Sequence, residues 1–278
     1  MTIVHGIRVL ATALFLTATS SAYADPVALR RTSTRELRAK SNGVDYRLYI
    51  SLPPGYETSK ARYPVIYLLD ADYSFAIAHN VVEHLAERQH LPWAIVVGIA
   101  YGGEPQYRLN RTRDYTPTHT LEVTPGTEHQ RPFQKHSGGG PKFRDFLRTE
   151  LLPLIDRTYR TSSERVLVGH SYGGLFGTWM LLTAPEVFTG YIVVSPSLWY
   201  DERMIFKVSG DKALRGRAYL AAGAMENPVM GNEVREMAKL LRARGGVEVR
   251  DEVPEGETHN SIFPGAFSRG IRWVLKGR

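Results

Sequence analysis

A serine set between glycines, where a strand pattern gives way to a helix pattern, constrains this chain most. Residues 165–174 read Arg-Val-Leu-Val-Gly-His-Ser-Tyr-Gly-Gly. The apolar run 166–168 is typical of a buried strand, and the stretch 175–182 is typical of a helix. Between them, Gly169-His170-Ser171-Tyr172-Gly173 matches the G-x-S-x-G pattern of a nucleophile elbow, a sharp strand-to-helix turn. An ordinary glycine-rich loop is the alternative, and the flanking strand and helix favour the elbow.

The elbow predicts a partner for Ser171. A serine hydroxyl is a poor nucleophile at neutral pH and needs a general base, usually a histidine oriented by a carboxylate. In elbow hydrolases the chain order is Ser, then Asp or Glu, then His. His259 is the only histidine after Ser171, in a polar stretch between a predicted strand and a predicted helix. We therefore expect His259 to be the base, the alternative being a solvated loop histidine.

Several acidic residues separate Ser171 from His259, and their positions distinguish them. Glu226 directly follows the predicted strand 217–222, where a carboxylate can meet the histidine loop. Glu233 falls in a predicted helix instead. We expect Glu226 to be the catalytic acid, although the helix dipole would also favour an acid at this helix start. Asp201 and Asp211 are the remaining candidates.

The oxyanion that forms when an ester carbonyl is attacked requires N–H donors that already point at it. One predicted donor is the backbone N–H of Tyr172, directly after the nucleophile. The second is expected after the buried strand 63–69, from Ala71 or Asp72. The side chains of Asp70 and Asp72 are expected to hold that turn.

The wider pattern predicts one α/β domain. Strand patterns and helix patterns alternate in the later half, which implies a mostly parallel sheet with helices on both faces. In such sheets the active site lies beyond the carboxyl ends of the strands, so the elbow, Glu226 and His259 should open on one edge. Residues 25–41 show little periodicity. Residues 101–140 form a long irregular stretch, and loops of that length are usually functional or disordered.

The beginning of the chain predicts export. Arg8 precedes an apolar run, and Ala22-Tyr23-Ala24 is an A-x-A cleavage pattern. We expect a signal peptide at 1–24 and a single domain at 25–278, located in the periplasm or secreted. The alternative is an uncleaved N-terminal anchor. No other segment has the ~18 consecutive apolar residues that membrane insertion needs.

Composition excludes several kinds of chemistry. The chain has no cysteine, so disulfides, thiolate metal sites and a cysteine nucleophile are excluded. His79 and His84 are five apart, not the four that place two ligands on one helix face, and H-E-x-x-H is absent, so no metal site is expected. The net charge is +7. Because no basic run or nucleic-acid-binding motif accompanies it, we expect a basic surface and no nucleic-acid partner.

Several segments together carry a family resemblance. They are residues 63–72 (Tyr-Pro-Val-Ile-Tyr-Leu-Leu-Asp-Ala-Asp), 111–117 (Arg-Thr-Arg-Asp-Tyr-Thr-Pro), 137–147, 169–174, 195–199 (Ser-Pro-Ser-Leu-Trp) and Thr258-His259. With these the chain resembles the esterase family of α/β hydrolases that includes esterase D and the enterochelin-type siderophore esterases. The resemblance implies an α/β-hydrolase fold and cofactor-free serine ester hydrolysis, with the nucleophile at Ser171 and the histidine at His259.

The resemblance leaves two positions open. The family's acid varies, and some siderophore esterases use largely a Ser–His dyad, so it does not settle Glu226. Many relatives have glycine where this chain has Ala71. If that position needs a positive φ, alanine would be strained there.

The resemblance also suggests a substrate. Exported members of the group include siderophore esterases that cleave the trilactone of catecholate siderophores, whose ferric complexes are anionic. Arg111 and Arg113 are therefore candidate ligand contacts, although pairing with Asp114 is an equal alternative. Trp199 and Tyr200 either line an aromatic pocket or fill the core.

Other reactions fit the same residues. A carbohydrate acetyl or feruloyl esterase, or a general carboxylesterase, would need the same machinery. An acyltransferase would use the same acyl-enzyme with a sugar or lipid acceptor in place of water. A non-catalytic binding protein on this scaffold is the remaining alternative, against which the intact Ser171 and His259 argue.

Overall fold

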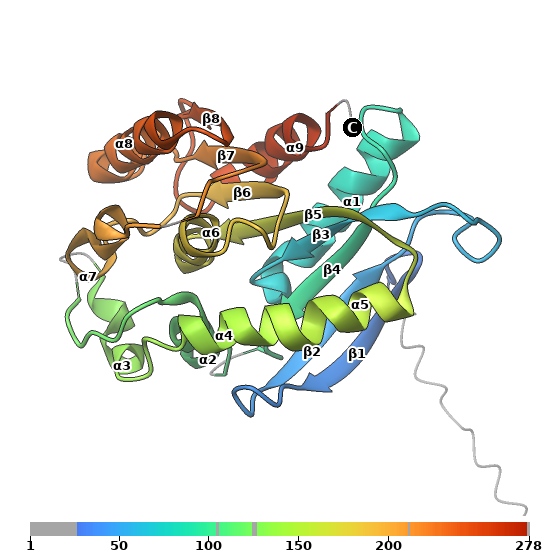
Figure 1. Ribbon diagram of the computed structural model, residues 1–278, viewed down its shortest axis with the longest axis horizontal. Helices are drawn as coiled ribbons and strands as arrows, with labels where there is room; N and C mark the ends of the chain where they lie inside the picture. The colour runs from blue at the N-terminus through green and yellow to red at the C-terminus, as the bar shows by residue number, and fades with distance from the viewer. Residues whose placement is uncertain (1–26, 104–105, 124–126, 211, 277–278) are drawn as a thin grey trace, which may run out of the picture.

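An eight-stranded sheet runs through the part of the chain that the computed structural model describes, residues 27–103, 106–123, 127–210 and 212–276 (Figure 1). The strands are β1 (Thr32–Arg38), β2 (Asp45–Ser51), β3 (Tyr63–Leu68), β4 (Ile95–Ala100), β5 (Thr161–His170), β6 (Gly190–Val194), β7 (Arg217–Ala221) and β8 (Glu248–Glu252). Their order in the sheet is β1-β2-β4-β3-β5-β6-β7-β8. The β1–β2 and β2–β4 pairs are antiparallel and the other neighbouring strands are parallel.

Helices cover both faces of this sheet. They are α1 (Ala71–Glu87), α2 (Gln106–Tyr115), α3 (Arg131–Gln134), α4 (Gly140–Phe146), α5 (Leu152–Thr158), α6 (Tyr172–Thr183), α7 (Tyr200–Arg203), α8 (Pro228–Arg244) and α9 (Ile262–Val274). The described residues also contain the 3-10 helices η1 (Glu128–Gln130) and η3 (Met204–Lys207), and the π-helical turn η2 (Leu147–Leu151), which joins α4 to α5. Helices α1 and α9 pack on one face, and α4, α5, α6 and α8 pack on the other.

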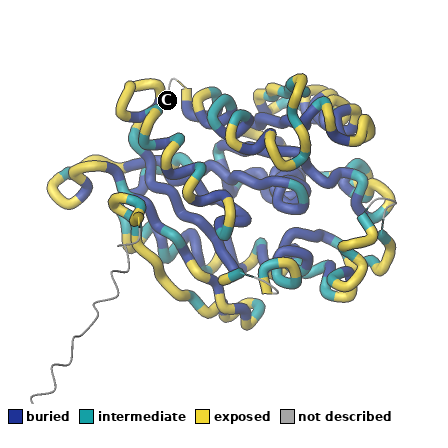
Figure 2. Tube along the Cα trace, turned by 180° about the vertical axis from the view of Figure 1, so that it is seen from behind, coloured by how far each residue is buried: buried dark blue, intermediate teal, exposed yellow. Residues whose placement is uncertain are grey.

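The two faces of β3 show why both sides are covered. Successive side chains of a strand point to opposite faces, so an apolar residue at every position needs a partner on each side. Val65 and Tyr67 belong to the core beneath α4–α6, whereas Ile66 and Leu68 belong to the core beneath α1 and α9. All four are fully buried. Figure 2 shows the same layering, with buried strands inside and exposed residues on outer helix faces and loop tips.

This architecture confirms the predicted fold class, a mostly parallel sheet with helices on both faces. Two elements were not apparent from the sequence pattern. Residues 25–41 contain β1, an edge strand whose largely exposed residues carry no apolar alternation. Residues 101–140 contain α2, whose buried positions include Arg111, Thr112 and Asp114, so hydrophobic periodicity does not reveal it.

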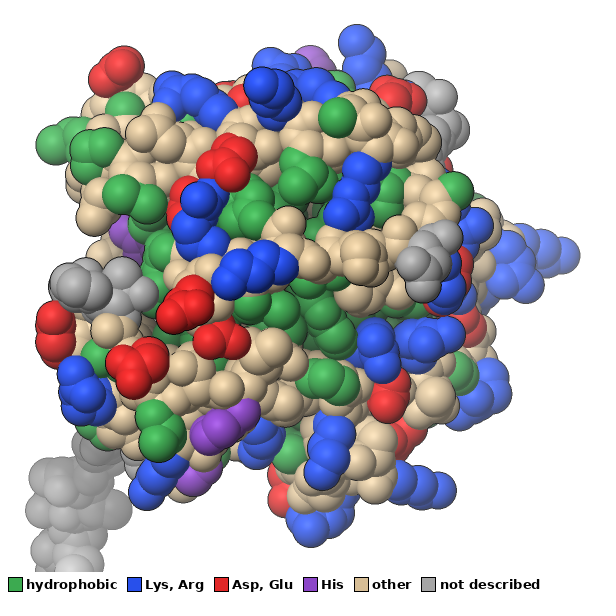
Figure 3. Space-filling model, turned by 60° about the vertical axis from the view of Figure 1, so that its left-hand side comes forward, with side chains coloured by type: hydrophobic (Ala, Val, Ile, Leu, Met, Phe, Trp, Pro, Cys, Tyr) green, Lys and Arg blue, Asp and Glu red, His purple; other side chains and the backbone are tan. Residues whose placement is uncertain are grey.

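On the face shown in Figure 3, basic side chains are interspersed with acidic ones. Among the described residues no helix is both long and apolar enough to cross a membrane, and no group of histidine and acidic side chains could hold a metal ion. The predicted signal peptide, residues 1–24, lies outside the described part of the chain.

Candidate active site

The predicted elbow is present at the carboxyl end of β5. Strand β5 ends at His170 and α6 begins at Tyr172, so the turn consists of Ser171. Its φ of 58° and ψ of −120° are strained for a residue with a side chain. A Cβ at position 169 would lie 2.1 Å from the carbonyl oxygen of Gly173. Gly169 is therefore required by the turn, as the motif implies.

Glu226 and His259 come together from two neighbouring loops. Glu226 follows β7 and His259 precedes α9, and the N–H of Met225 donates to the carbonyl of Glu257 at 2.9 Å, which ties the loops together. His259 Nδ1 donates to Glu226 Oε2 at 2.7 Å. With its proton on Nδ1, the His259 ring keeps Nε2 as an acceptor, the state that a general base requires.

The carboxylate of Glu226 is held in its ionised form. Its Oε1 accepts from the Ser195 hydroxyl and from the Gly223 N–H, each at 2.6 Å. Burial would raise the pKa of Glu226, but the hydrogen bonds from His259, Ser195 and Gly223 hold it below its ordinary value of 4.5. An ionised carboxylate therefore faces His259 at neutral pH.

The other acidic residues that were considered lie elsewhere. The Asp201 carboxylate accepts from the Thr118 hydroxyl. Glu233 lies within α8, 3.1 Å from the guanidinium of Arg203. Asp211 is outside the described residues. The structure thus places Glu226, and neither Asp201 nor Glu233, against His259.

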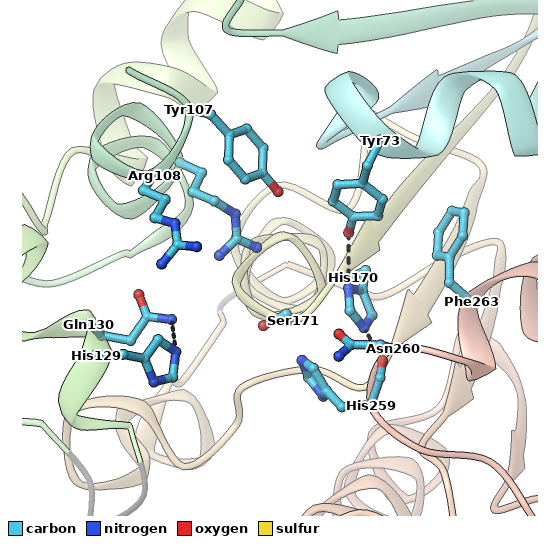
Figure 4. Close-up of a pocket in the computed structure, with 11 residues that line it drawn as sticks. Tyr73, Tyr107, Arg108, His129, Gln130, His170, Ser171, His259, Asn260 and Phe263 are labelled. Atoms are coloured by element: carbon cyan, nitrogen blue, oxygen red, sulfur yellow. Dashed lines mark hydrogen bonds between the residues drawn. The ribbon is translucent and has the colours of Figure 1, made fainter. Parts of the chain in front are cut away.

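Two cavities, of about 510 and about 490 Å³, meet at Ser171 and His259. Residues His129 and Gln130 of η1 border both. The first cavity has a wall of aromatic and basic side chains that comes from α1, α2 and α9 (Figure 4): Tyr73, Tyr107, Phe263, Arg108 and Arg111. The second is more apolar and is lined by Trp199, Met225, Val229 and Met230. Ser171 therefore lies between a cavity with a basic, aromatic wall and a more apolar cavity.

The predicted ligand contacts are only partly brought together. Arg111 reaches the first cavity while its guanidinium pairs with Asp70. Arg113 lines neither cavity, because it makes two hydrogen bonds to Asp114, at 2.7 and 3.1 Å. The structural alternative predicted for Arg113 is therefore the one that the structure shows.

Of the two predicted aromatic contacts, Trp199 and Tyr200, one lines a cavity at the serine and the other does not. Trp199 lines the second cavity beside Ser171. Tyr200 is fully buried, donates from its hydroxyl to the carbonyl of Thr118 at 2.9 Å, and borders neither of the two cavities at the serine. Tyr200 is therefore a core residue.

The helix starts expected to supply the oxyanion donors are adjacent. A Cβ at Gly173, in the first turn of α6, would lie 3.5 Å from Leu69 Cβ, just before α1. The residue with positive φ is Asp70, at 54°, and not Ala71. Aspartate tolerates this region better than most residues, so the strain considered for Ala71 does not arise. The Asp72 carboxylate accepts from the N–H groups of residues 101–103, which ties the start of α1 to the loop after β4.

Sequence reasoning missed most of the first cavity's wall. Tyr107 and Arg108 belong to the 101–140 stretch, which the sequence marks as functional without showing which residues face inward. Tyr73 and Phe263 sit in the first turns of α1 and α9, where they looked like ordinary helix residues. His170 occupies a variable position of the elbow motif and gave no signal of its own.

The fold and the site define the class. The sheet order, with β4 placed before β3, and a serine at the elbow that borders the same cavities as the histidine of a Glu–His pair are those of an α/β hydrolase. The chain belongs to the esterase family, since the family model described as “Putative esterase” matches residues 39–242. It is therefore an ester hydrolase by family, as the resemblance implied.

Individual relatives cover nearly the whole chain. Ferri-bacillibactin esterase BesA of Bacillus subtilis (strain 168) is 32% identical over 274 residues, which cover 92% of each chain. Siderophore triacetylfusarinine C esterase of Aspergillus fumigatus is 28% identical, with 82% of this chain and 88% of the relative covered.

Solved structures agree with these relatives. The BES protein from Bacillus cereus superposes with a TM-score of 0.79 at 26% identity, covering 91% of this chain and 99% of its own. An IroE-like serine hydrolase from Shewanella oneidensis gives 0.77 at 29% identity, covering 88% and 80%.

Proposed function

We propose that this protein is an exported serine esterase that hydrolyses the ester bonds of siderophores through an acyl-enzyme on Ser171. The observation that carries the proposal is the 2.7 Å contact between His259 Nδ1 and Glu226, made at the point where two cavities meet the strained serine. This is the arrangement that converts a serine hydroxyl into a nucleophile.

In the first half of the reaction, Ser171 Oγ attacks the ester carbonyl carbon while His259 Nε2 takes its proton. Glu226 keeps the ring in the correct tautomer and stabilises the imidazolium. His259 then returns the proton to the departing alkoxide, and the C–O bond to the alcohol breaks. The acyl group remains as an ester on Ser171.

In the second half, water attacks the acyl-enzyme. His259 takes a proton from the water and delivers it to Ser171 Oγ as the acid leaves. In both halves negative charge develops on the carbonyl oxygen. The N–H of Tyr172 and an N–H at the start of α1, from Ala71 or Asp72, are the proposed donors to that oxygen.

The substrate proposal rests on the relatives and on the first cavity. The curated names of two relatives specify bacillibactin and triacetylfusarinine C esters. We propose a catecholate trilactone, free or as its anionic ferric complex. Arg108 and Arg111 place guanidinium groups in the cavity wall, and Tyr73 and Tyr107 offer faces on which a catechol ring can stack.

The decisive experiment is an ester panel assayed with the wild type and Ser171→Ala. The panel contains ferric and iron-free catecholate trilactones, p-nitrophenyl esters, and acetylated or feruloylated sugars. We expect trilactone opening and p-nitrophenyl release by the wild type, with both lost in Ser171→Ala. Ser209→Ala, an exposed serine ahead of β7, is the matched control and should stay active.

Each alternative predicts a different outcome of that panel. Turnover of sugar esters alone would replace the siderophore substrate with a carbohydrate ester. Ester transfer to an added sugar or lipid acceptor would make the protein an acyltransferase. Full activity of Ser171→Ala would refute the mechanism, and failure of Ser171 to react with a fluorophosphonate would favour a binding protein.

Export is tested separately. The proposal of a periplasmic or secreted enzyme rests on the N-terminal sequence pattern. Fractionation of producing cells, followed by N-terminal sequencing of the purified enzyme, should yield a chain that begins at Asp25. A cytoplasmic protein that retains residues 1–24 would refute this part of the proposal.

A further inference from the structure

The side chain of His170, the residue before the nucleophile, contacts the backbone of the predicted base, His259. Strand β5 ends at His170, and its side chain is buried. Its Nε2 lies 2.8 Å from the carbonyl oxygen of His259, and its Nδ1 lies 2.9 Å from the Tyr73 hydroxyl (Figure 4). One side chain thus joins α1, the elbow and the loop that carries His259.

The hydrogen-bond partners of His170 determine which of its ring nitrogens carries the proton. A carbonyl oxygen can only accept a hydrogen bond, so His170 Nε2 must carry the proton. Its Nδ1 is then an acceptor, and the Tyr73 hydroxyl donates to it. A neutral imidazole satisfies both contacts in a single tautomer, which the His259 carbonyl selects and to which the Tyr73 hydroxyl adapts as donor.

The surroundings keep His170 neutral. Burial, and next the neighbouring His259, lower the pKa of His170 to about 3. The two imidazole rings are 4.6 Å apart, centre to centre, so a charged His170 would oppose the imidazolium that forms on His259 during the reaction. Arg111 disfavours the charged form further, while Glu226 acts in the opposite direction.

His259 needs such support because it lies in a partly exposed loop. Its side chain is 37% exposed, and its ring is held at Nδ1 by Glu226. That contact orients the ring but leaves the position of the backbone to the loop. A second contact, at the His259 carbonyl, fixes the point from which the ring projects.

We propose that His170 is a positioning residue, which donates from Nε2 to the His259 carbonyl and so sets the distance between the base and Ser171, while the Tyr73 hydroxyl donates to its Nδ1 and holds the ring in place. The inference rests on the proposed Ser171–His259–Glu226 mechanism. It adds a second set of hydrogen bonds that supports the base, from Tyr73 through His170 to the His259 backbone.

The test compares two replacements of His170 in the full-length enzyme. Leucine fills space without donating, whereas glutamine places an amide N–H near the original Nε2. We expect His170→Leu to lower kcat by about 10- to 100-fold with KM little changed, since misplacing a catalytic group by about 1 Å has an effect of this size. His170→Gln should recover most of the loss.

A spectroscopic readout separates positioning from packing. The proton between His259 Nδ1 and Glu226 should give a downfield ¹H resonance in the wild type and in His170→Gln. It should be lost or broadened in His170→Leu. The exposed His84→Gln on α1 is the control and should leave kcat and the resonance unchanged. Wild-type kcat in a folded His170→Leu, or equal losses in both His170 variants, would overturn the proposal.

Tyr73→Phe provides a second route if His170→Leu does not fold. It removes the hydroxyl and keeps the ring, so kcat should fall, and combination with His170→Gln should give less than the product of the separate effects. If the two substitutions together lowered kcat by the full product of their separate factors, Tyr73 and His170 would act independently, and the proposal would be contradicted. Ser171→Ala keeps the two hypotheses apart: its retained activity refutes the mechanism, whereas its inactivity together with an active, folded His170→Leu refutes this inference alone.

Discussion

Asp70 and Arg111 form a bidentate ion pair at the first cavity, which Arg111 lines, with Nε to Oδ1 at 2.9 Å and Nη2 to Oδ2 at 3.1 Å. Asp70 is fully buried and Arg111 nearly so. Burial alone would lower the pKa of Arg111, but Asp70 raises it well above its ordinary value, so the guanidinium stays charged. The pair ties α2 to the turn that begins α1, beside the elbow.

The buried pair predicts a large loss of stability when it is broken. Arg111→Leu leaves the Asp70 carboxylate buried without its cation, so the free energy of unfolding should fall by about 3–5 kcal/mol. Arg38→Leu is the control, because the Arg38–Asp45 pair is exposed and should contribute less than about 1 kcal/mol. Urea unfolding measures both. Unchanged stability of Arg111→Leu with a raised KM would mean that Arg111 serves the ligand and not the fold.

Substitution of alanine for glycine should have opposite effects in the elbow turn and inside α6. Gly169→Ala should disrupt the turn and abolish ester hydrolysis, since its Cβ would meet the Gly173 carbonyl at 2.1 Å. Gly177→Ala, inside α6, would place its Cβ at an ordinary 3.6 Å from Val193. Because alanine favours helix over glycine by about 1 kcal/mol, this variant should be active and no less stable. Thermal melts and p-nitrophenyl ester assays test both, and an active Gly169→Ala would contradict the strained turn.

Glu226→Gln tests the third member of the proposed triad. A glutamine of the same shape cannot stabilise the imidazolium and can hold His259 in the wrong tautomer, so kcat should fall by about 10³- to 10⁴-fold. Glu255→Gln, an exposed change in the same loop as His259, is the control. Steady-state kinetics with a p-nitrophenyl ester measures the effect. A fully active Glu226→Gln would identify a Ser–His dyad.

Glu233 predicts a pH-dependent stability that is separate from catalysis. Burial raises its pKa to about 7, despite the nearby Arg203. Between its ordinary value of 4.5 and about 7, the folded state holds a proton that the unfolded chain has released, so this group lowers stability as the pH rises through that range. Glu233→Gln should therefore raise the melting temperature more at pH 8 than at pH 5. The exposed Glu57→Gln should show no such difference, and an equal gain at both pH values for Glu233→Gln would contradict the raised pKa.

The three proposed catalytic residues, Ser171, His259 and Glu226, could be predicted from the sequence alone. A strand, a glycine-bounded serine and a helix are local patterns, so Ser171 could be predicted from one stretch of sequence. His259 followed from chain order, because it is the only histidine after the serine. Glu226 followed from its place at the end of a strand, since the carboxyl ends of parallel strands share an edge.

The remaining features depend on contacts between distant segments. Helix α2 was not visible in the sequence because its buried side chains include the charged Arg111 and Asp114, which can be buried only where their partners pack against them. In the same way, nothing local distinguishes Arg111 from Arg113. One reaches the cavity wall and pairs with Asp70, and the other pairs with its neighbour and lies outside both cavities at the serine.

The sequence by itself therefore determined the kind of fold, the elbow and the order of Ser171, Glu226 and His259, because hydrophobic period, glycine spacing and chain order act locally or through simple sheet geometry. Tertiary structure alone decided what surrounds them. The contact of His170 with the His259 backbone joins residues 89 positions apart, and Arg111 meets Asp70 across 41. Such contacts form only after the sheet edge has assembled, since each polar group is stable in the interior only when its partner arrives there with it.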